Sequence, residues 1–418
     1  MRDNTENPTH ATKTAPLQYP PLRLCAFARQ FRNSTYAANL APLCYPPLRD
    51  NSENLPTPRR LPRLRRHKPL ASLLGLYLLA QFPVQLCNGL SCCLGKLVHL
   101  GIGKAPNKST LSYANEHRPA ALFEDLFYTA LQRFRDEQGL GRRKAKFRFK
   151  NKLLSLDSTT ITLCCNLFPW AKFRKAKGGV KAHVLLDHDD YLPGFVFITD
   201  AKRSDVKMAD AFTLNAGSIV VTDRGYNDYA LFGKWTSQEV YFVTRLKDNA
   251  AYEVVEECVR PQDRTIRRDQ LIRFTGVQAR RDCPGLLRRV VVWDENNQRE
   301  IELLTNQLAF GSTTIAAIYK DRWEIELFFK ALKQNLKVKS FVGTSENALR
   351  IQIWTALIAL LLLKWLHHLS KAKWSLSNLA SMLRLNLFTY RDLLTWLHAP
   401  FGTPPLPPPS EQLLLALA

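Results

Sequence analysis

The sequence lacks the cysteine patterns that bind zinc or build a disulfide framework. Its nine cysteines are scattered, two of the close pairs (Cys92 with Cys93, Cys164 with Cys165) are directly adjacent, and no CxxC pair occurs. This usage favours free thiols in a reducing cytoplasm. The first residues also lack a charged region that leads into an apolar run, so we expect no secretory signal.

Apolar runs long enough to span a membrane are also missing. Residues 70–86 form a run of 17 that is broken by Gly75, Gln81 and Pro83, and residues 353–363 form an unbroken run of only 11. A spanning helix needs about 20 apolar residues. We therefore expect no membrane association, and we interpret residues 353–363 as a buried core helix. The sequence leaves the structure of residues 70–86 open.

Acidic residues are scarce, and their scarcity points to a polyanionic partner. The chain has 59 Lys and Arg against 36 Asp and Glu, which gives a net charge of +23. Such an excess is most often a sign of nucleic-acid binding, although charge alone also allows a membrane surface or a ribosomal context. Residues 142–181 carry twelve basic residues and a single acid, Asp157, with aromatic residues interleaved. We prefer a surface for the DNA backbone here, over solvated strands whose aromatics face the core.

The chain is long enough for two or three domains. Residues 1–68 contain repeated proline- and asparagine-rich segments, and residues 15–23 recur as residues 41–49. We expect these first 68 residues to form an atypical, disordered low-complexity segment. Residues 69–150 are predicted to be a helical, DNA-binding region. Residues 151–345 are predicted to be an α/β catalytic domain with a mixed sheet, in which residues 247–310 form a β-rich insertion. Residues 346–418 are predicted to be helical, with a disordered proline-rich tail.

Two aspartates fall at strand positions in the predicted sheet. Residues 153–163 alternate and are rich in β-branched side chains, which indicates a strand with Asp157 inside it. The short apolar strand 218–222 ends on Asp223, and its composition is typical of a buried central strand. The other expected elements of this core are strands at 180–187, 191–199 and 240–246, and helices at 205–215 and 228–235.

Residues 319–333 contain no Gly or Pro and predict one continuous helix. At helical pitch, Tyr319, Arg322, Glu326 and Lys333 share one face, while the remaining surface is mostly apolar. The residues alone do not choose between a solvated face with ion pairs and a site that faces a charged ligand.

The order of elements places three carboxylates where they can converge. The first and fourth strands of such a sheet are neighbours, and the later helix packs across their ends, so Asp157, Asp223 and Glu326 are expected to meet. Carboxylates this close need cations, and hard oxygen ligands favour Mg²⁺ or Mn²⁺. Two such ions can activate an attacking oxygen and stabilise the leaving oxygen of a phosphodiester.

These motifs closely resemble the signature of DDE transposases of the insertion-sequence-four family. The resemblance rests on Asp157 in Leu-Ser-Leu-Asp-Ser-Thr, on Asp223-Arg-Gly-Tyr, and on the Tyr-Arg-Glu-Lys spacing of the 319–333 helix. The two aspartates are 66 residues apart, and Glu326 follows 103 residues later. The resemblance covers about residues 90–400 and implies an RNase H-like core.

The family implies a function and roles for matching residues. Asp157, Asp223 and Glu326 would bind two Mg²⁺ ions, for which Mn²⁺ can substitute, and would cut DNA at the element's ends and transfer strands to target DNA. In many relatives the second strand is cut through a DNA hairpin. Tyr319, Arg322 and Lys333 would contact terminal phosphates, and we add Arg224 to this DNA-binding set.

Other expectations follow from the same resemblance. In relatives an aromatic residue of the β-rich insertion holds a flipped base. Trp293 is our candidate for it, with Tyr252 and Phe274 as competitors. The partners would be double-stranded DNA, in the form of terminal inverted repeats and target, and a second copy of the chain in the DNA complex. The location would be the bacterial cytoplasm, at the nucleoid. The alternative is a catalytically inactive or domesticated DNA-binding derivative, which the unusual residues 1–85 favour.

Overall fold

The computed structural model describes residues 87–88, 90–91, 97, 103–141, 146–164, 166–174, 177–335, 343–386 and 393–402. The expected low-complexity segment 1–68, the apolar run 70–86 and the proline-rich tail lie outside these residues.

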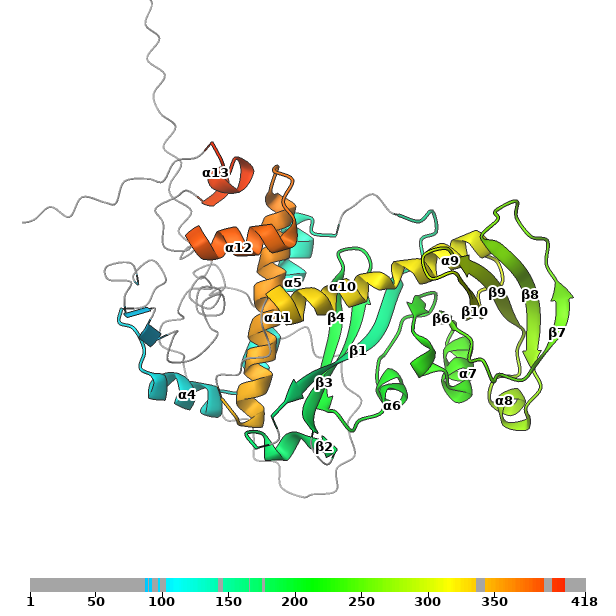
Figure 1. Cartoon of the computed structure of the whole chain (residues 1–418), viewed down its shortest axis with the longest axis horizontal. Coiled ribbons are helices and arrows are strands. Elements are labelled where there is room, and N and C mark those ends of the chain that lie inside the picture. Colours follow the sequence, from blue (N-terminus) through cyan, green and yellow to red (C-terminus); the bar gives the residue numbers. More distant parts are fainter. Residues whose placement is uncertain are drawn as a thin grey trace, which may run out of the picture.

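A ten-stranded mixed sheet forms the centre of the protein (Figure 1). Its strands are β1 (Leu153–Leu163), β2 (Lys172–Arg174), β3 (Lys177–Asp187), β4 (Leu192–Asp200), β5 (Ile219–Val221), β6 (Tyr241–Arg245), β7 (Tyr252–Glu257), β8 (Ile266–Phe274), β9 (Leu287–Asp294) and β10 (Arg299–Thr305). They are ordered β2-β3-β1-β5-β6-β10-β9-β8-β7, and β4 also pairs with β3. This arrangement confirms the prediction of a mixed α/β fold.

The pairing around β1 follows the predicted neighbour relation. β1 is antiparallel to β3 and parallel to β5, and β5 is parallel to β6. The observed β1 coincides with the strand predicted at residues 153–163. Its β-branched run, from Thr159 to Thr162, suits the pleated surface between two neighbours. The first and fourth strands of the predicted core are therefore adjacent, as the argument for convergent carboxylates requires.

The β-rich segment 247–310 extends the same sheet. β10 pairs antiparallel with β6, and β9, β8 and β7 follow outward, so the expected β-rich insertion is continuous with the core. A buried ion pair links two of these strands: Arg288 of β9 donates two hydrogen bonds of 2.7 Å to the Asp269 carboxylate of β8. Arg288 also donates to the carbonyl of Leu308, which fixes the chain just before it enters the next helix.

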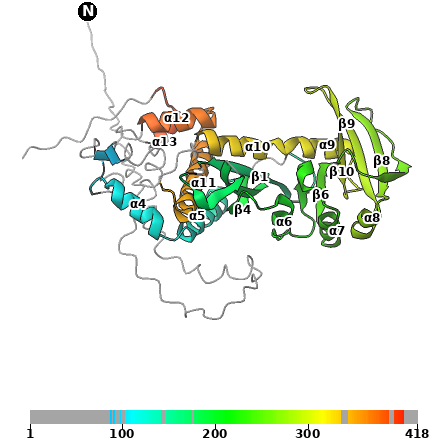
Figure 2. The ribbon, with the colours of Figure 1, turned by 60° about the horizontal axis from the view of Figure 1, so that its bottom comes forward.

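The helices cover both faces of the sheet. They are α4 (Lys108–His117), α5 (Ala121–Gln138), α6 (Asp205–Ala209), α7 (Tyr229–Ser237), α8 (Val277–Asp282), α9 (Ser312–Asp321), α10 (Trp323–Lys330), α11 (Glu346–Leu369), α12 (Leu376–Asn386) and α13 (Leu393–His398). In Figure 2, α9 and α10 run along one side of the sheet, while α6, α7 and α8 lie on the opposite side. Two buried apolar clusters lie on the side of the sheet that carries α9 and α10. A third lies on the side that carries α6, α7 and α8.

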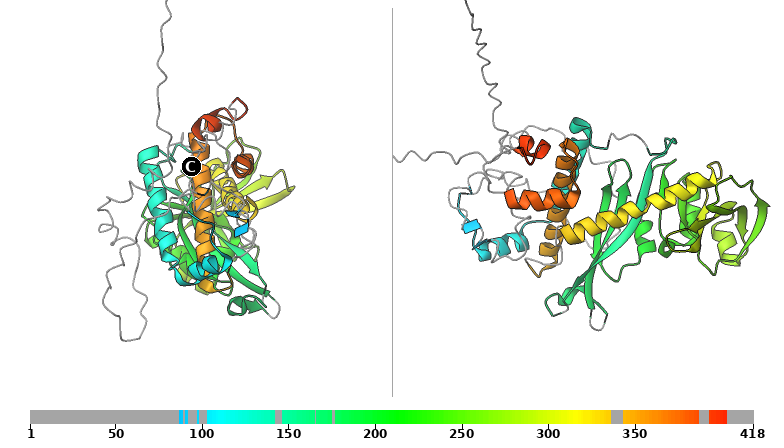
Figure 3. Two further views of the ribbon diagram at one scale, coloured as in Figure 1. Left: turned by 90° about the vertical axis from the view of Figure 1, so that its left-hand side faces the viewer. Right: turned by 45° about the horizontal axis from the view of Figure 1, so that its top comes forward.

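The largest apolar cluster extends beyond the predicted catalytic domain. It joins β1, β3 and β4 to α5, α10, α11, α12 and α13. α5 and α11 lie side by side (Figure 3). α5 precedes residues 151–345 in the chain, and α11, α12 and α13 follow them. These helices thus share one hydrophobic core with the sheet.

α11 is the core helix expected around residues 353–363. It is long and apolar enough to cross a membrane by length and composition, but 78% of its apolar window is buried inside the protein. Ser345 caps its first turn by accepting from the Ala348 amide at 3.2 Å. Packing against α5 and α12 accounts for its hydrophobicity.

Two predicted helices differ from the structure. α6 ends at Ala209 rather than near residue 215, and the carbonyl of Asp210 accepts from Lys234 of α7 instead of continuing the helix. The helix predicted at 319–333 starts seven residues earlier, changes at Arg322, and ends in a π-helical turn, η6 (Ala331–Asn335). At the junction, Arg322 donates to Tyr319 and Ile325 donates to Arg322, both over three residues, so the helix tightens locally.

Candidate active site

Asp157 and Asp223 occupy the same level of two adjacent strands. In the parallel pair of β1 and β5, Ser155 is opposite Val221, and each aspartate follows two residues later. Neighbouring strands lie about 4.8 Å apart, and residues two apart share a face. Leu153 and Ile219, which have the same parity, pack in the cluster beneath α9. Both carboxylates therefore project from the face of the sheet that α9 and α10 cover.

Glu326 reaches this site from α10. The helix buries Ile325 and Phe328 in the apolar cluster that includes Ile161 of β1. Burial of these side chains fixes the helix across the sheet, and Glu326 stays partly exposed, at 36% of its side chain. The structure thus brings the three predicted carboxylates to one place, from β1, from the end of β5 and from α10.

Arg322 lies between two of these carboxylates. Its Nη2 donates to Glu326 Oε1 at 2.8 Å, and its Nη1 is 3.5 Å from Asp157 Oδ2. The guanidinium carbon lies 5.6 Å from the centre of the Tyr319 ring. Its Nε is buried without a hydrogen-bond partner among the described residues. Tyr319, Arg322 and Glu326 therefore form one contiguous group, as their spacing predicted.

The pKa of the Asp157 carboxyl group is raised, mainly by burial and further by neighbouring carboxylates. Burial raises the pKa of its carboxyl group, the neighbouring Asp223 and Glu326 raise it further, and the Ser158 amide and Arg322 lower it. The resulting pKa is about 6, against an ordinary value of 3.8. Arg322 and Arg245 together carry two positive charges against three carboxylates, so the site favours an additional cation.

The residues after β5 orient Asp223. Its side chain accepts a 2.8 Å hydrogen bond from the Gly225 amide and so caps the short 3₁₀ turn η5 (Arg224–Tyr226). A Cβ at position 225 would lie 3.0 Å from Asp223 Oδ1, which explains why glycine suits this position. Thr244 of β6 donates to the Asp223 carbonyl at 3.0 Å. The Asp-Arg-Gly sequence is thus a turn that holds a carboxylate at the strand end.

Arg245 is a residue of this site that the sequence reasoning missed. β5 and β6 are parallel with Val221 opposite Val243, so Arg245 stands at the level of Asp223, one strand away. Its charge lowers the pKa of the Tyr319 phenol, although burial, the largest effect, leaves that pKa above its ordinary value. Arg245 Nε is buried, with no hydrogen-bond partner in the described part of the chain. An arginine that ends a strand gives no signal in the sequence.

Two of the predicted DNA-binding residues lie at the margin. Arg224 points to solvent and pairs with the exposed Asp248 at 3.3 Å. Lys333 lies in the π-helical turn η6 and is partly buried. Because a π-helical turn is wider than an α-helical one, Lys333 does not keep the regular helical phase that the sequence suggested.

Trp293 lies beside a cleft in the insertion. The cleft, of about 610 Å³, is lined by the segment from Arg260 to Arg267 together with Trp293 and Glu295. The guanidinium carbon of Arg267 lies 5.3 Å from the centre of the Trp293 ring. Of the competing aromatics, Phe274 is buried in the core at 1% exposure, and Tyr252 packs against Arg289. Trp293 is the better placed of the three to stack on an external ring.

The carboxylate site fits a divalent cation by its chemistry. Its donors are carboxylate oxygens, which suit Mg²⁺ or Mn²⁺, and its charge is incompletely balanced. Within the described ranges, no group of three or more His, Cys, Asp or Glu side chains is close enough to hold a metal ion. Arg322 bridges Asp157 and Glu326 instead. Asp157, Asp223 and Glu326 are the carboxylates of this site from which ligands for such an ion would come.

Comparison with known proteins supports a single family. Residues 148–362, about half of the chain, match the Transposase DDE domain. A transposase of Sinorhizobium fredii is 31% identical over 293 residues, which cover 69% of this chain and 80% of that protein. The transposase for insertion sequence element IS5377 of Geobacillus stearothermophilus is 33% identical, over 56% of this chain and 62% of that protein.

Two more distant similarities accompany these. The transposase InsG for insertion sequence element IS4 of Escherichia coli is 23% identical over 39% of this chain and 38% of that protein. A piggyBac transposase, solved as a synaptic complex with hairpin DNA, aligns over 79% of this chain and 73% of that chain, at 10% identity and a TM-score of 0.37.

The matched domain contains Asp157, Asp223 and Glu326, and the relatives from Geobacillus stearothermophilus and Escherichia coli are transposases for insertion sequence elements. The chain belongs to the DDE transposases, in the insertion-sequence-four family.

Proposed function

We propose that this transposase cuts DNA strands at the ends of its own insertion sequence and transfers them to target DNA, with Asp157, Asp223 and Glu326 as the catalytic carboxylates. The observation that carries the proposal is the placement of Asp157 and Asp223 at one level of adjacent parallel strands, beneath the helix that presents Glu326. The strand order β4-β3-β1-β5-β6 supports an RNase H-like core.

The three carboxylates would hold two Mg²⁺ ions, for which Mn²⁺ can substitute. When bound, such ions activate an attacking oxygen and stabilise the developing charge on the leaving oxygen. Water attacks the phosphorus at the element's end, and the bond to the 3′ oxygen breaks. That oxygen takes a proton and leaves as a 3′-OH, which later attacks a phosphodiester of the target.

The cationic residues around the carboxylates would bind the substrate. Arg322, whose side chain is 15% exposed between two carboxylates, is suited to a phosphate, and Arg245 and Tyr319 stand beside it. Lys333 and Arg224 would contact phosphates further out. When DNA arrives, its phosphate competes with Asp157 and Glu326 for the Arg322 guanidinium, which frees these carboxylates for cations.

The β-rich insertion would contribute Trp293 as the residue that holds a flipped base. Its place beside a cleft with Arg267, Arg260 and Arg264 gives a ring for stacking and cations for the adjoining phosphates. Of the alternatives, Phe274 is buried, and Tyr252, half-buried like Trp293, packs against the apolar cluster that contains α7.

The remaining regions would serve binding and assembly. Residues 69–150 would form a helical DNA-binding region, residues 151–345 the catalytic domain, and residues 346–418 a helical C-terminal region that shares its core. The net charge of +23 supports double-stranded DNA as the partner, both terminal repeats and target. We propose a homodimer in the DNA complex, located at the bacterial nucleoid.

The second candidate is an inactive or domesticated DNA-binding derivative. The observation in its favour is that Arg322, rather than a shared coordination centre, joins Asp157 and Glu326, and that no metal-binding group of three is formed within the described residues. Such a protein would bind DNA without cutting it.

One assay separates the two. A supercoiled plasmid that carries the chain's own gene with its flanking DNA is incubated with protein and Mg²⁺, and nicked and linear products are counted. We expect cleavage by the wild type, none by Asp223→Asn, and wild-type cleavage by the exposed control Asp248→Asn. Binding without cleavage by the wild type would favour the inactive derivative.

A further inference from the structure

A buried hydrogen-bonded chain connects two elements of the candidate active site. His188, in the turn between β3 and β4, contacts Asp321 Oδ2 through Nδ1 at 2.6 Å and Ser155 Oγ through Nε2 at 2.7 Å. The side chains of His188 and Asp321 are 5% and 2% exposed, and Ser155 is completely buried. Lys146 also pairs with Asp321, through Oδ1.

The order Ser155, His188, Asp321 is that of a nucleophilic triad, but its burial excludes that chemistry. Ser155 lies in β1, between β3 and β5, and has no exposed surface through which a substrate could approach. An attacking hydroxyl needs room for the reacting atom within about 3 Å. The chain of hydrogen bonds therefore has a role in holding elements together.

The positions of its ends suggest what it holds. Ser155 is two residues before Asp157 on the same face of β1, and Asp321 is the last residue of α9, directly before Arg322. Arg322 is the point where the helix tightens and α10, with Glu326, begins. His188 thus spans the distance between the strand and the helix junction that together form the carboxylate site.

We propose that His188 and Asp321 are positioning residues, which fix the α9–α10 junction on β1 so that Arg322 and Glu326 face Asp157. This inference rests on the proposed cleavage function for its catalytic consequence, although the structural link can be tested independently. Partners that hold a ligand in place commonly alter activity by about 10- to 100-fold when they are removed.

The charge environment fits a fixed His188–Asp321 contact. Burial raises the pKa of Asp321, but the hydrogen bonds from His188 and Lys146 lower it by more, so the carboxylate is retained as an acceptor. The Tyr191 hydroxyl also lies beside this carboxylate, 3.5 Å from Asp321 Oδ2. The backbone amide of His188 also donates to the Leu153 carbonyl at 3.1 Å, which attaches the turn to the start of β1.

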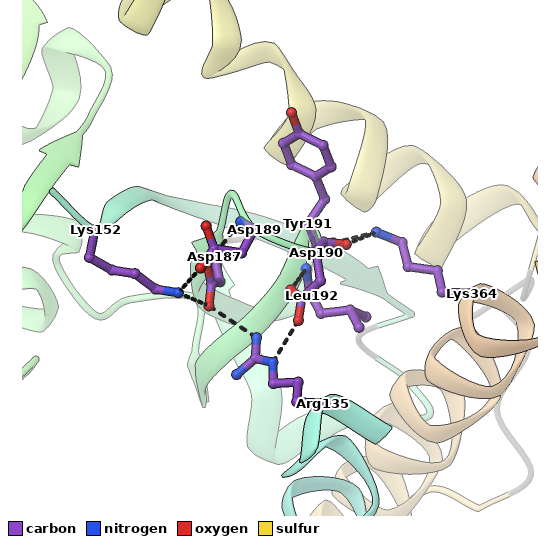
Figure 4. Close-up of polar contacts among 8 residues, drawn as sticks. All are labelled: Arg135, Lys152, Asp187, Asp189, Asp190, Tyr191, Leu192 and Lys364. Carbon is purple, nitrogen blue, oxygen red and sulfur yellow. Dashed lines mark hydrogen bonds and ion pairs between the residues drawn. The ribbon is translucent and has the colours of Figure 1, made fainter. Parts of the chain in front are cut away.

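The same turn is anchored on other sides by contacts that do not reach α9. Figure 4 shows Arg135 of α5 bonded to Asp187 and Asp190, at 3.1 and 2.6 Å, and Lys364 of α11 bonded to the Tyr191 carbonyl. Arg135→Gln therefore weakens the turn without touching the α9–α10 junction. It is a matched control for a general loss of stability.

The first experiment compares the two nitrogens of His188. In His188→Asn the amide nitrogen replaces Nδ1 and keeps the bond to Asp321, whereas in His188→Gln it replaces Nε2 and keeps only the bond to Ser155. Single-turnover cleavage of the plasmid with the chain's own gene is measured at saturating Mg²⁺ and protein, together with DNA affinity. We expect His188→Gln and Asp321→Asn to cleave about 10- to 100-fold more slowly with DNA affinity within about 2-fold. His188→Asn and Arg135→Gln should stay within about 3-fold of the wild type.

A second measurement does not depend on activity. Hydrogen–deuterium exchange is followed on peptides that cover residues 319–326, whose amides bond across the junction. We expect faster exchange there in His188→Ala and unchanged exchange there in Arg135→Gln. Equal exchange in both variants, or equal cleavage rates for the Asn and Gln variants, would overturn the positioning role. If the wild type does not cleave but the exchange result holds, the proposed function fails and the structural link stands.

Discussion

Arg322 and Glu326 form a hydrogen-bonded ion pair inside the carboxylate site, with 2.8 Å between Nη2 and Oε1. The same guanidinium is 3.5 Å from Asp157. Because Arg322 is also the residue that we propose for a DNA phosphate, the carboxylates and the substrate would compete for one cation. In this proposal, substrate binding and exposure of the metal ligands are coupled through a single side chain.

Replacing Arg322 should weaken DNA binding and reduce its salt dependence. Loss of one phosphate contact lowers the slope of log affinity against log salt by about 0.9. We expect Arg322→Ala to show this change in fluorescence-anisotropy titrations between low and moderate salt. Arg350→Ala, which removes an exposed arginine paired with Glu346 within α11, is the control and should leave the slope unchanged. An unaltered slope in Arg322→Ala would remove this residue from the phosphate-binding role.

Asp157→Asn should stabilise the metal-free protein at neutral pH. The pKa of Asp157 is raised to about 6 in the folded state, so its ionisation disfavours folding above that pH and has no such effect below about pH 4. A shift of this size corresponds to at most about 3 kcal/mol. Denaturant melts in EDTA should show the gain at pH 8 and its disappearance towards pH 4. A variant that is less stable than the wild type at pH 8 would contradict the raised pKa of Asp157.

The location of the carboxylate site followed from local patterns. Alternation and β-branching identified β1, which contains Asp157. A short apolar run shortly before Asp223 identified β5, since a run of this length and composition is typical of a buried strand. Leu153 and Leu154 are buried on opposite faces of β1, so the apolar pattern identified the strand, whereas pairing with β3 and β5 set the face of Asp157.

The irregular parts of the site were not visible in the sequence. The tightening at Arg322 and the π-helical turn at Lys333 contain no Gly or Pro that would mark them, and the π-helical turn packs against α11 and α12. From its sequence neighbours, Asp321 would be expected to be an ordinary exposed acid. In the structure it is buried and contacts His188 and Lys146, which are 133 and 175 residues away in the chain. Such long-range partners are set by topology, which no local pattern reports.

Trp293→Ala should slow cleavage, and Trp293→Phe should restore much of it. Stacking of a base on an aromatic side chain is worth about 1–3 kcal/mol, or about 5- to 150-fold in rate or affinity when it is lost. Single-turnover cleavage of the plasmid substrate measures the effect, and Tyr252→Ala tests the competing aromatic. A larger loss in Tyr252→Ala than in Trp293→Ala would assign the stacking role to Tyr252.

Arg245 should matter as much as the residues of the signature itself. Because Arg245 is only half-buried and stands at the level of Asp223, we expect its positive charge to attract a substrate phosphate. We expect Arg245→Gln to weaken DNA binding by about 10-fold, since hydrogen bonds to charged groups contribute about 1.5–3 kcal/mol. Thermal melts should show that the variant is folded. Wild-type affinity in a folded Arg245→Gln would exclude the contact.

The most direct test of the carboxylate site compares two glutamates on the same turn of α10. Glu326 faces Arg322 and Asp157, whereas Glu324 is two residues away and forms no ion pair within the part of the chain that the structure describes. Cleavage of DNA that carries the chain's own gene and flanks is measured with Mg²⁺, with EDTA, and with Mn²⁺ added after EDTA. The account predicts metal-dependent cleavage by the wild type and by Glu324→Gln, and none by Glu326→Gln under any condition. Cleavage by Glu326→Gln at the wild-type rate, or cleavage that persists in EDTA, would contradict it.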